Sequence, residues 1–331
     1  MVQAPASAVH IAGKPPEIVP VRRVVALMNA GAGAFNQNLA EDVKDALAAS
    51  FTHLGVSAAI IFTDGEKLRG AAEAALAQAK RGEIDAVVVG GGDGSVRTVA
   101  AVLADSGVPL GVLPLGTLNH FAKDLGMPLK VEEAAAAIAG GHTRSVDIAE
   151  VNGHTFINNS SIGIYPYMVI ERERRRARHK LAKWMAMVPA FFRMLHHFPR
   201  RRLRISAENF ARPYRTPCLF VGNNEYAMQL FSFGRRHGLD AGELWFYVVK
   251  PRSPFEFFLM VCRMCFGRID EERDLDRFHL REAEVSAKTS RLFVALDGEI
   301  RLMHTPLHYR SRHLALRVIM PAGGRRHGFQ P

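Results

Sequence analysis

The residues whose types and spacing point to chemistry begin with a glycine-rich stretch at 90–95, Gly-Gly-Gly-Asp-Gly-Ser. The run 86–89 before it is wholly apolar and predicts a buried strand, while residues 96–103 after it predict a helix. Glycines at such a junction let backbone N–H groups approach an oxyanion, and the positive end of the helix dipole favours negative charge. The stretch is therefore predicted to hold phosphate groups.

An aspartate stands among these glycines. The stretch lacks the Gly-Lys-Ser/Thr ending of a P-loop and the glycine spacing of a dinucleotide-binding turn. A carboxylate beside phosphates is repelled unless a divalent cation or its water shell lies between them. Asp93 therefore predicts a nucleotide that is bound together with Mg²⁺.

Two later motifs extend this pattern. Residues 114–122 read Pro-Leu-Gly-Thr-Leu-Asn-His-Phe-Ala, and residues 296–299 read Leu-Asp-Gly-Glu. In this order the three motifs resemble the diacylglycerol kinase catalytic family, which includes soluble bacterial lipid kinases, sphingosine kinases and ceramide kinases. The resemblance covers residues 22–321. The first motif is shared with NAD kinases, whereas the second separates the lipid kinases from them.

The resemblance implies an enzyme that uses ATP and Mg²⁺ to phosphorylate a hydroxyl of diacylglycerol or a related lipid. It implies that Asp93 and Glu299 are catalytic, with Glu299 as the general base. An alcohol needs such a base because its pKa lies far above 7. The residues that match the family's nucleotide-binding positions are Asn29, Thr63, Gly91, Gly92, Asp93, Gly94, Ser95, Val96, Arg97, Gly116 and Thr117.

Several of these residues also have simpler interpretations. Asn29 precedes glycines and fits an ordinary turn, and Thr63 fits a helix N-cap. Arg97 replaces a residue of the family pattern and fits either a phosphate ligand or a solvated helix position. The Asp-Gly pair before Glu299 is also a hairpin signal.

Two further positions depart from the family pattern. His120 stands where the family usually has aspartate, which removes a carboxylate from the expected Mg²⁺ environment. Asp124 fits either a replacement metal ligand or a surface charge on a helix. Ala241 replaces the aspartate that holds a second, structural Mg²⁺ in relatives, so that site is doubtful even with Asp240 and Glu243 beside it.

The pattern of elements predicts two domains. Residues 21–140 alternate apolar strands and helices, which favours an α/β domain with a mostly parallel, doubly wound sheet that binds the nucleotide. Residues 141–321 contain many short strands and predict a β-rich, sandwich-like domain for the lipid substrate. Residues 1–20 and 322–331 are expected to be loose tails.

The composition favours a soluble globular protein. The chain has 331 residues, of which 48% are hydrophobic, and only three cysteines. Three cysteines form no disulfide framework and suit a reducing cytoplasm. No signal peptide and no run of about 20 apolar residues is present.

Positive charge is concentrated in one segment. Residues 171–204 carry a formal net charge of +10, compared with +11 for the whole chain. Leu181, Trp184, Val188, Phe191 and Leu195 recur there at helical spacing, which fits either a core helix or an amphipathic helix at a lipid surface. We expect this segment to bind an anionic membrane and to place the protein on the inner face of the membrane. Nucleic acid is disfavoured because aromatic residues do not alternate with the arginines.

Three functions compete at this stage. A lipid kinase accounts for all three motifs and for the basic segment. An NAD kinase accounts only for the first motif. A non-catalytic regulator that binds lipid or nucleotide accounts for the departures at Arg97, His120 and Ala241.

Overall fold

The computed structural model describes most of the chain, and its parts form two compact units. The first unit comprises Met1–Asp147, Arg236–Ala241 and His313–Pro331, and the second comprises Ile148–Arg235 and Gly242–Arg312. The described residues are 17–29, 37–164, 166, 200–226, 236, 238–251, 253–265 and 271–322.

The first unit is built on a parallel sheet with the order β5-β4-β2-β3. Its strands are short apolar runs, and every residue of β4 is buried. Runs of this kind are typical of parallel strands that are covered on both faces. The strands are β2 (Arg23–Asn29), β3 (Ser57–Thr63), β4 (Ala86–Gly91) and β5 (Leu110–Pro114).

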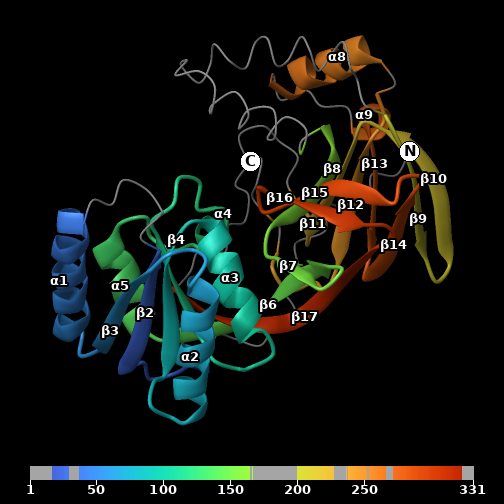
Figure 1. Cartoon of the computed structure of the whole chain (residues 1–331). Coiled ribbons are helices and arrows are strands. Elements are labelled where there is room, and N and C mark those ends of the chain that lie inside the picture. The colour runs from blue at the N-terminus through green and yellow to red at the C-terminus, as the bar shows by residue number, and fades with distance from the viewer. Residues whose placement is uncertain are drawn as a thin grey trace, which may run out of the picture. The chain divides into compact units, whose positions relative to one another are not determined.

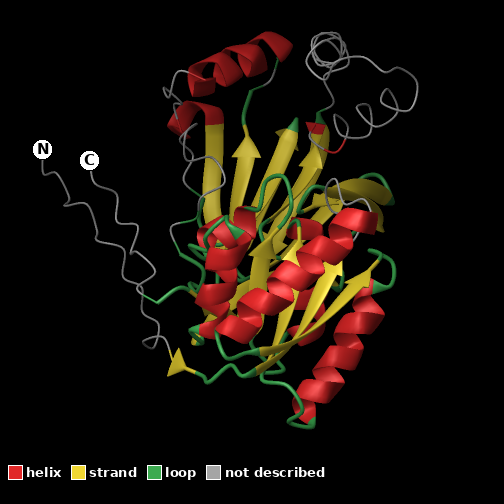
Figure 2. Ribbon diagram, turned by 90° about the vertical axis from the view of Figure 1, so that its left-hand side faces the viewer, coloured by secondary structure: helices red, strands yellow, loops and turns green. Residues whose placement is uncertain are grey.

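Five helices accompany this sheet. Helix α2 has the bounds that its alanine-rich pattern predicts, and it packs against α3, while α1 packs against α5 (Figure 1). Figure 2 shows helices in red and strands in yellow. The helices are α1 (Gln37–His53), α2 (Leu68–Lys80), α3 (Asp93–Leu103), α4 (His120–Asp124) and α5 (Val131–Ala139).

The unit boundaries differ from the predicted domain boundaries. Strand β6 (His142–Val151) begins in the first unit, and the end of β17 (Leu307–Met320) returns to it, where Val318 pairs in parallel with β5. Strand β1 (Glu17–Ile18) pairs with β6, so the predicted N-terminal tail is wrong for these two residues. Pairing between strands that are far apart in the sequence sets these boundaries, and local composition does not indicate that pairing.

The second unit is rich in β-strands, as predicted. Strands β10, β9, β14 and the first part of β17 are neighbours in one sheet, in that order. A separate six-stranded sheet has the order β13-β12-β11-β8-β15-β16. Their bounds are β7 (His154–Phe156), β8 (Asn159–Gly163), β9 (Arg201–Ala207), β10 (Phe210–Thr216), β11 (Cys218–Asn223), β12 (Leu244–Val249), β13 (Leu275–Leu280), β14 (Glu282–Ala287), β15 (Arg291–Leu296) and β16 (Glu299–His304).

The core of the second unit lies between these two sheets. Tyr309 from β17 meets Phe156 and Phe246 edge-on, with ring centroids 6.3 and 6.0 Å apart. Burial raises the pKa of the Tyr309 hydroxyl, which lies 3.0 Å from the Ser160 hydroxyl. The buried aromatic rings give the β-rich unit a hydrophobic core of its own.

The remaining described helices are α8 (Pro254–Cys265) and α9 (Glu271–Asp274). Within the β-rich part the sequence predicts two helical stretches, at about 170–197 and 254–266, and α8 corresponds to the second. The first stretch, most of the basic segment at 171–204 and residues 323–331 lie outside the described residues. Among the helices that the structure describes, none has the length and apolar character needed to cross a membrane.

Candidate active site

The candidate nucleotide site lies along one edge of the parallel sheet in the first unit. Asn29 is in register with Thr63, and Gly91 is in register with Pro114. Met28, next to Asn29, is in register with Gly90. The carboxyl ends of all four strands therefore form one row, which is where ligands bind in open α/β sheets.

The first glycine loop leads directly from β4 into α3. The amide of Asn29 donates a 2.7 Å hydrogen bond to the hydroxyl of Ser95, which ties the end of β2 to the first turn of the helix. A Cβ atom on Gly91 would lie 2.7 Å from that hydroxyl. The Ser95 hydroxyl that bonds Asn29 therefore leaves no room for a side chain at position 91.

The second loop folds around the side chain of Asn119. Its amide oxygen accepts the Gly116 N–H at 2.9 Å, and its amide nitrogen donates to the carbonyls of Gly116 and Pro114 at 2.8 and 3.2 Å. Asn119 has a φ of 52°, a left-handed conformation that asparagine tolerates better than most residues. The sequence analysis assigned no role to Asn119, although it stands in the second motif.

The two loops touch through their glycines. A Cβ atom on Gly116 would lie 2.3 Å from the Cα atom of Gly92. Only glycine at both positions allows the two backbones to approach so closely.

Asp93 joins the same two loops. Its oxygens accept hydrogen bonds from the backbone N–H groups of Phe121, at 3.0 Å, and His120, at 3.2 Å. The carboxylate therefore holds the start of α4. Asp93 was predicted as a catalytic, nucleotide-binding and Mg²⁺-binding residue, and the structure adds this contact between the loops.

The other residues predicted to bind the nucleotide differ in exposure and in place. Val96 and Arg97 are only 2% and 6% exposed, so Arg97 is not a solvated helix residue. Thr117 is exposed at the tip of the second loop. Thr63 ends β3, but the cap of the next helix is Lys67, so the N-cap interpretation of Thr63 is wrong.

Asp124 is not placed as a metal ligand. Its side chain and that of Arg236 are 5% and 0% exposed and form an ion pair of 2.8 Å. Burial raises the pKa of Asp124 above its ordinary value, and Arg236 opposes the shift. The metal role and the surface-charge role proposed for Asp124 are both corrected, because a buried guanidinium already neutralises this carboxylate.

The carboxylates near Ala241 also have partners. Asp240, in the first unit, forms an ion pair with Arg144. Glu243, in the second unit, accepts a hydrogen bond from Trp245 Nε1 at 3.2 Å and lies 3.2 Å from His279 Nδ1. No cluster of three or more His, Cys, Asp or Glu side chains able to hold a metal occurs in the described part of the chain.

The Asp-Gly-Glu motif lies in the second unit, at a tight turn between β15 and β16. Asp297 and Gly298 have φ values of 47° and 89°, as a two-residue hairpin of the Asp-Gly type requires. The hairpin interpretation is therefore correct. It leaves Glu299 as the first residue of β16, paired with Leu296 and exposed to solvent.

The turn is held by the side chain of Asp297. Its carboxylate accepts three backbone N–H groups, from Ile157 at 2.9 Å, Asn158 at 2.8 Å and Asn159 at 3.0 Å. Three donors fix the carboxylate, and with it the backbone of the next residues. Asp297 therefore positions Glu299, a role that the sequence analysis did not assign.

The fold and these loops define a protein with a parallel sheet that ends in two glycine loops, and with a β-rich second unit. Residues 23–151 match the family model described as "Diacylglycerol kinase catalytic domain". The resemblance drawn from the motifs is thereby confirmed.

Relatives of known sequence match a shorter stretch. The chain is 42% identical over 85 residues to a protein named "Probable lipid kinase YegS-like" from Yersinia pestis (strain Pestoides F). A relative of the same name from Yersinia pseudotuberculosis (serotype O:1b) matches equally well. The match covers 24% of this chain and 29% of each relative, so it spans less than a third of their length.

Solved structures match almost the whole chain. The crystal structure of a diacylglycerol kinase from Bacillus anthracis (strain Sterne) has a TM-score of 0.65 at 21% identity, and a second structure from the same strain reaches 0.71. Both comparisons cover 93% of this chain and 100% of the other. At this identity they establish the fold, a mixed α/β chain with a large sheet and a β-rich C-terminal part.

Proposed function

We propose that this protein is a lipid kinase that transfers the γ-phosphoryl group of ATP to a hydroxyl of diacylglycerol or a related lipid. The observation that carries the proposal is the pair of glycine loops held together at the sheet edge by Asp93. Gly92 and Gly116 meet there without side chains, and α3 begins at the same point. A polyphosphate is the ligand that such a backbone surface fits best.

The residues of the first unit bind and orient ATP in this proposal. Helix α3 begins at this edge of the sheet, and the positive end of its dipole favours negative charge there. Asn29 fixes the direction of the Ser95 hydroxyl beside them. Asp93 is half-buried, and its carboxylate lies where the two loops meet.

A carboxylate at this place fits a single Mg²⁺ that ATP brings with it. The metal would neutralise charge on the transferring phosphoryl group. A cage of several protein carboxylates is not required, because Mg²⁺ usually keeps waters and phosphate oxygens as ligands.

The second unit supplies the general base. Glu299 accepts the proton of the lipid hydroxyl as the new P–O bond forms, since a neutral alcohol is a poor nucleophile. Asp297 holds the turn that carries Glu299 and leaves the Glu299 side chain exposed. Because its substrate is a lipid, we infer that the enzyme works at the inner face of a membrane.

Radiolabelled ATP tests the proposal directly. The protein is incubated with γ-labelled ATP, Mg²⁺ and a total lipid extract, and in parallel with NAD. We expect label in a phospholipid and none in NADP. Label in NADP would replace the proposal with an NAD kinase, and binding of ATP without transfer to either acceptor would favour the non-catalytic regulator.

A further inference from the structure

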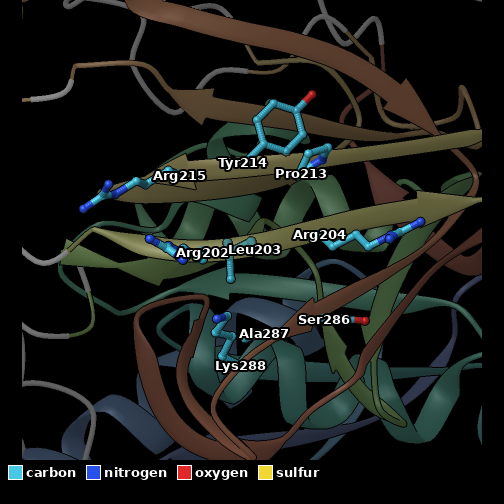
Figure 3. A pocket seen from close by; sticks show the side chains of 9 residues that line it. All are labelled: Arg202, Leu203, Arg204, Pro213, Tyr214, Arg215, Ser286, Ala287 and Lys288. Atoms are coloured by element: carbon cyan, nitrogen blue, oxygen red, sulfur yellow. The ribbon is translucent and has the colours of Figure 1, made fainter.

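A basic surface covers strands β9, β10 and β14 of the second unit. It lines an open depression of about 540 Å³ (Figure 3). We call this surface the basic sheet face and define it by its four cations, which are Arg202, Arg204, Arg215 and Lys288. The other lining residues are Leu203, Pro213, Tyr214, Ser286 and Ala287.

The arginines lie on the solvent side of this sheet. Along β9, Leu203 and Ile205 are 3% and 0% exposed, whereas Arg202 and Arg204 are exposed. Successive side chains of a strand point to opposite faces, so both arginines leave the core on the same side. Figure 3 shows Arg202 near Arg215 of the neighbouring strand, and Arg204 further along β9.

The register brings like charges together. Arg202 lies directly opposite Arg215 in the antiparallel pair of β9 and β10. Like charges in this position destabilise a sheet. None of the four cations forms an ion pair with the residues that the structure describes, although Arg212 and Arg310 of the same unit pair with Asp276 and Glu150.

Protection of a sheet edge explains only part of this charge. Strand β10 is at the edge, and charges or a proline such as Pro213 keep an edge from pairing with another chain. This accounts for Arg215. It does not account for Arg202 and Arg204, because β9 is paired on both sides, with β10 and with β14.

We propose that the basic sheet face docks on the phosphate headgroups of an anionic bilayer. The inference rests on the proposed lipid kinase function, because such an enzyme has to reach a substrate that lies in a membrane. Several cations on one rigid face are complementary to a surface of fixed negative charge. The sequence placed this contact in residues 171–204, and the structure adds Arg215 and Lys288 from later in the chain.

Single-stranded nucleic acid fits this face less well. Binding of that kind uses exposed aromatic rings on which bases stack. The one aromatic residue that lines the depression is Tyr214, whose ring stacks on Phe278 at 6.2 Å and whose hydroxyl donates to Asp276 at 2.9 Å. Its ring is thus already engaged within the unit.

Vesicle sedimentation tests the proposal. The full chain and the variant R202Q/R204Q/R215Q are mixed with vesicles of phosphatidylcholine alone or with added phosphatidylglycerol, at about 0.1 M salt and without ATP. We expect the wild type to prefer the anionic vesicles. The variant should bind them about a hundredfold more weakly, since each engaged arginine contributes roughly fivefold.

Two further variants make the result specific. R281Q/R291Q/R301Q removes the same charge from exposed positions of the same unit and should bind like the wild type. R202K/R204K/R215K keeps the charge and should retain most of the binding. The proposal is overturned if R202Q/R204Q/R215Q binds like the wild type, or if the control triple loses as much.

Two more outcomes separate this proposal from its alternatives. Loss of affinity for a single-stranded oligonucleotide with unchanged vesicle binding would reassign the face to nucleic acid. The vesicles contain no diacylglycerol, so sedimentation does not depend on catalysis. Transfer of label to detergent-dispersed lipid reports the kinase function by itself, and the two inferences can therefore fail independently.

Discussion

Asp93 and Phe121 are joined by a 3.0 Å hydrogen bond from the Phe121 backbone N–H to the Asp93 carboxylate, although 28 residues separate them. The other carboxylate oxygen accepts the N–H of His120. The aspartate that the sequence marks for metal chemistry therefore also links the two loops of the candidate nucleotide site. One residue holds the two glycine loops together and presents negative charge between them.

Replacement of Asp93 should affect both stability and activity. In Asp93→Asn a single amide oxygen replaces two charged acceptors, so we expect a loss of about 1.5–3 kcal/mol in the free energy of unfolding. Phosphoryl transfer should fall at least about a hundredfold, because the loops lose their register and the site loses its charge. Urea titration and initial rates measure the two effects. An unchanged unfolding free energy would contradict the structural role.

Two glycine-to-alanine variants, compared with each other, test the contact between the two loops. Gly116→Ala places a Cβ atom 2.3 Å from Gly92 Cα, so the loops must separate, and we expect ATP affinity to fall at least about tenfold. Gly70→Ala is the matched control, because Gly70 lies in α2 with nothing within 4 Å of its added Cβ. It should keep ATP affinity and gain up to about 1 kcal/mol in stability. Isothermal titration with ATP distinguishes the two variants.

Glu299→Gln tests the general base. The substitution keeps the shape of the side chain and removes its basicity, so kcat should fall by about 10²–10⁴ with little change in ATP affinity. The residue is exposed, so the free energy of unfolding should stay within about 0.5 kcal/mol of the wild type. A normal kcat would show that residues 297–299 serve only as a turn.

Asp297→Asn provides the comparison for that experiment. In the wild type the Asp297 carboxylate accepts three backbone N–H groups. The asparagine side chain of the variant has one oxygen acceptor fewer and carries no charge. We expect a loss of about 1–3 kcal/mol in stability together with a lower kcat. The Glu299 variant should show the loss of kcat alone. Equal stability of the two variants would remove the positioning role from Asp297.

The ion pair of Asp124 with Arg236 predicts a pH-dependent variant. Arg236→Met leaves the buried carboxylate without its cation, and we expect a loss of about 3–5 kcal/mol in the free energy of unfolding near neutral pH. Burial already raises the pKa of Asp124, and removal of Arg236 raises it further. The folded state then holds a proton that the unfolded state releases, so stability falls as pH rises above the ordinary aspartate pKa.

The loss in Arg236→Met should therefore be smaller near pH 5 than near pH 8, as measured by urea unfolding at both values. The double variant Asp124→Asn/Arg236→Met removes the charge as well and should recover most of the stability. A loss that is the same at both pH values would show that packing, and not the charge of Asp124, dominates at this position.

The sequence by itself determined the elements that rest on local patterns. The apolar run before Gly90 predicted β4, and the alanine-rich stretch predicted α2 with its observed bounds. The Asn152-Gly153 pair predicts a hairpin turn from sequence alone, and the turn between β6 and β7 has the positive φ values of 47° and 75° that these two residues suit. The three motifs were sufficient to recognise the family.

Strands without a clean alternation were missed. Strand β10 contains Pro213 and two arginines because it lies at an edge, and β16 starts at the exposed Glu299. Neither strand has the apolar pattern that marks a strand buried on one face. Their positions depend on partners far along the chain.

Only the tertiary structure decided what each site carboxylate contacts. Asp93 and Asp297 bind backbone N–H groups of distant segments, and Asp124 pairs with Arg236, 112 residues away. Nearly every residue has a backbone N–H group, so the sequence does not show which of these groups a carboxylate will contact. An arginine becomes the partner of a particular aspartate only when folding buries the two together, so residue types predicted the chemistry of the site and the fold chose its contacts.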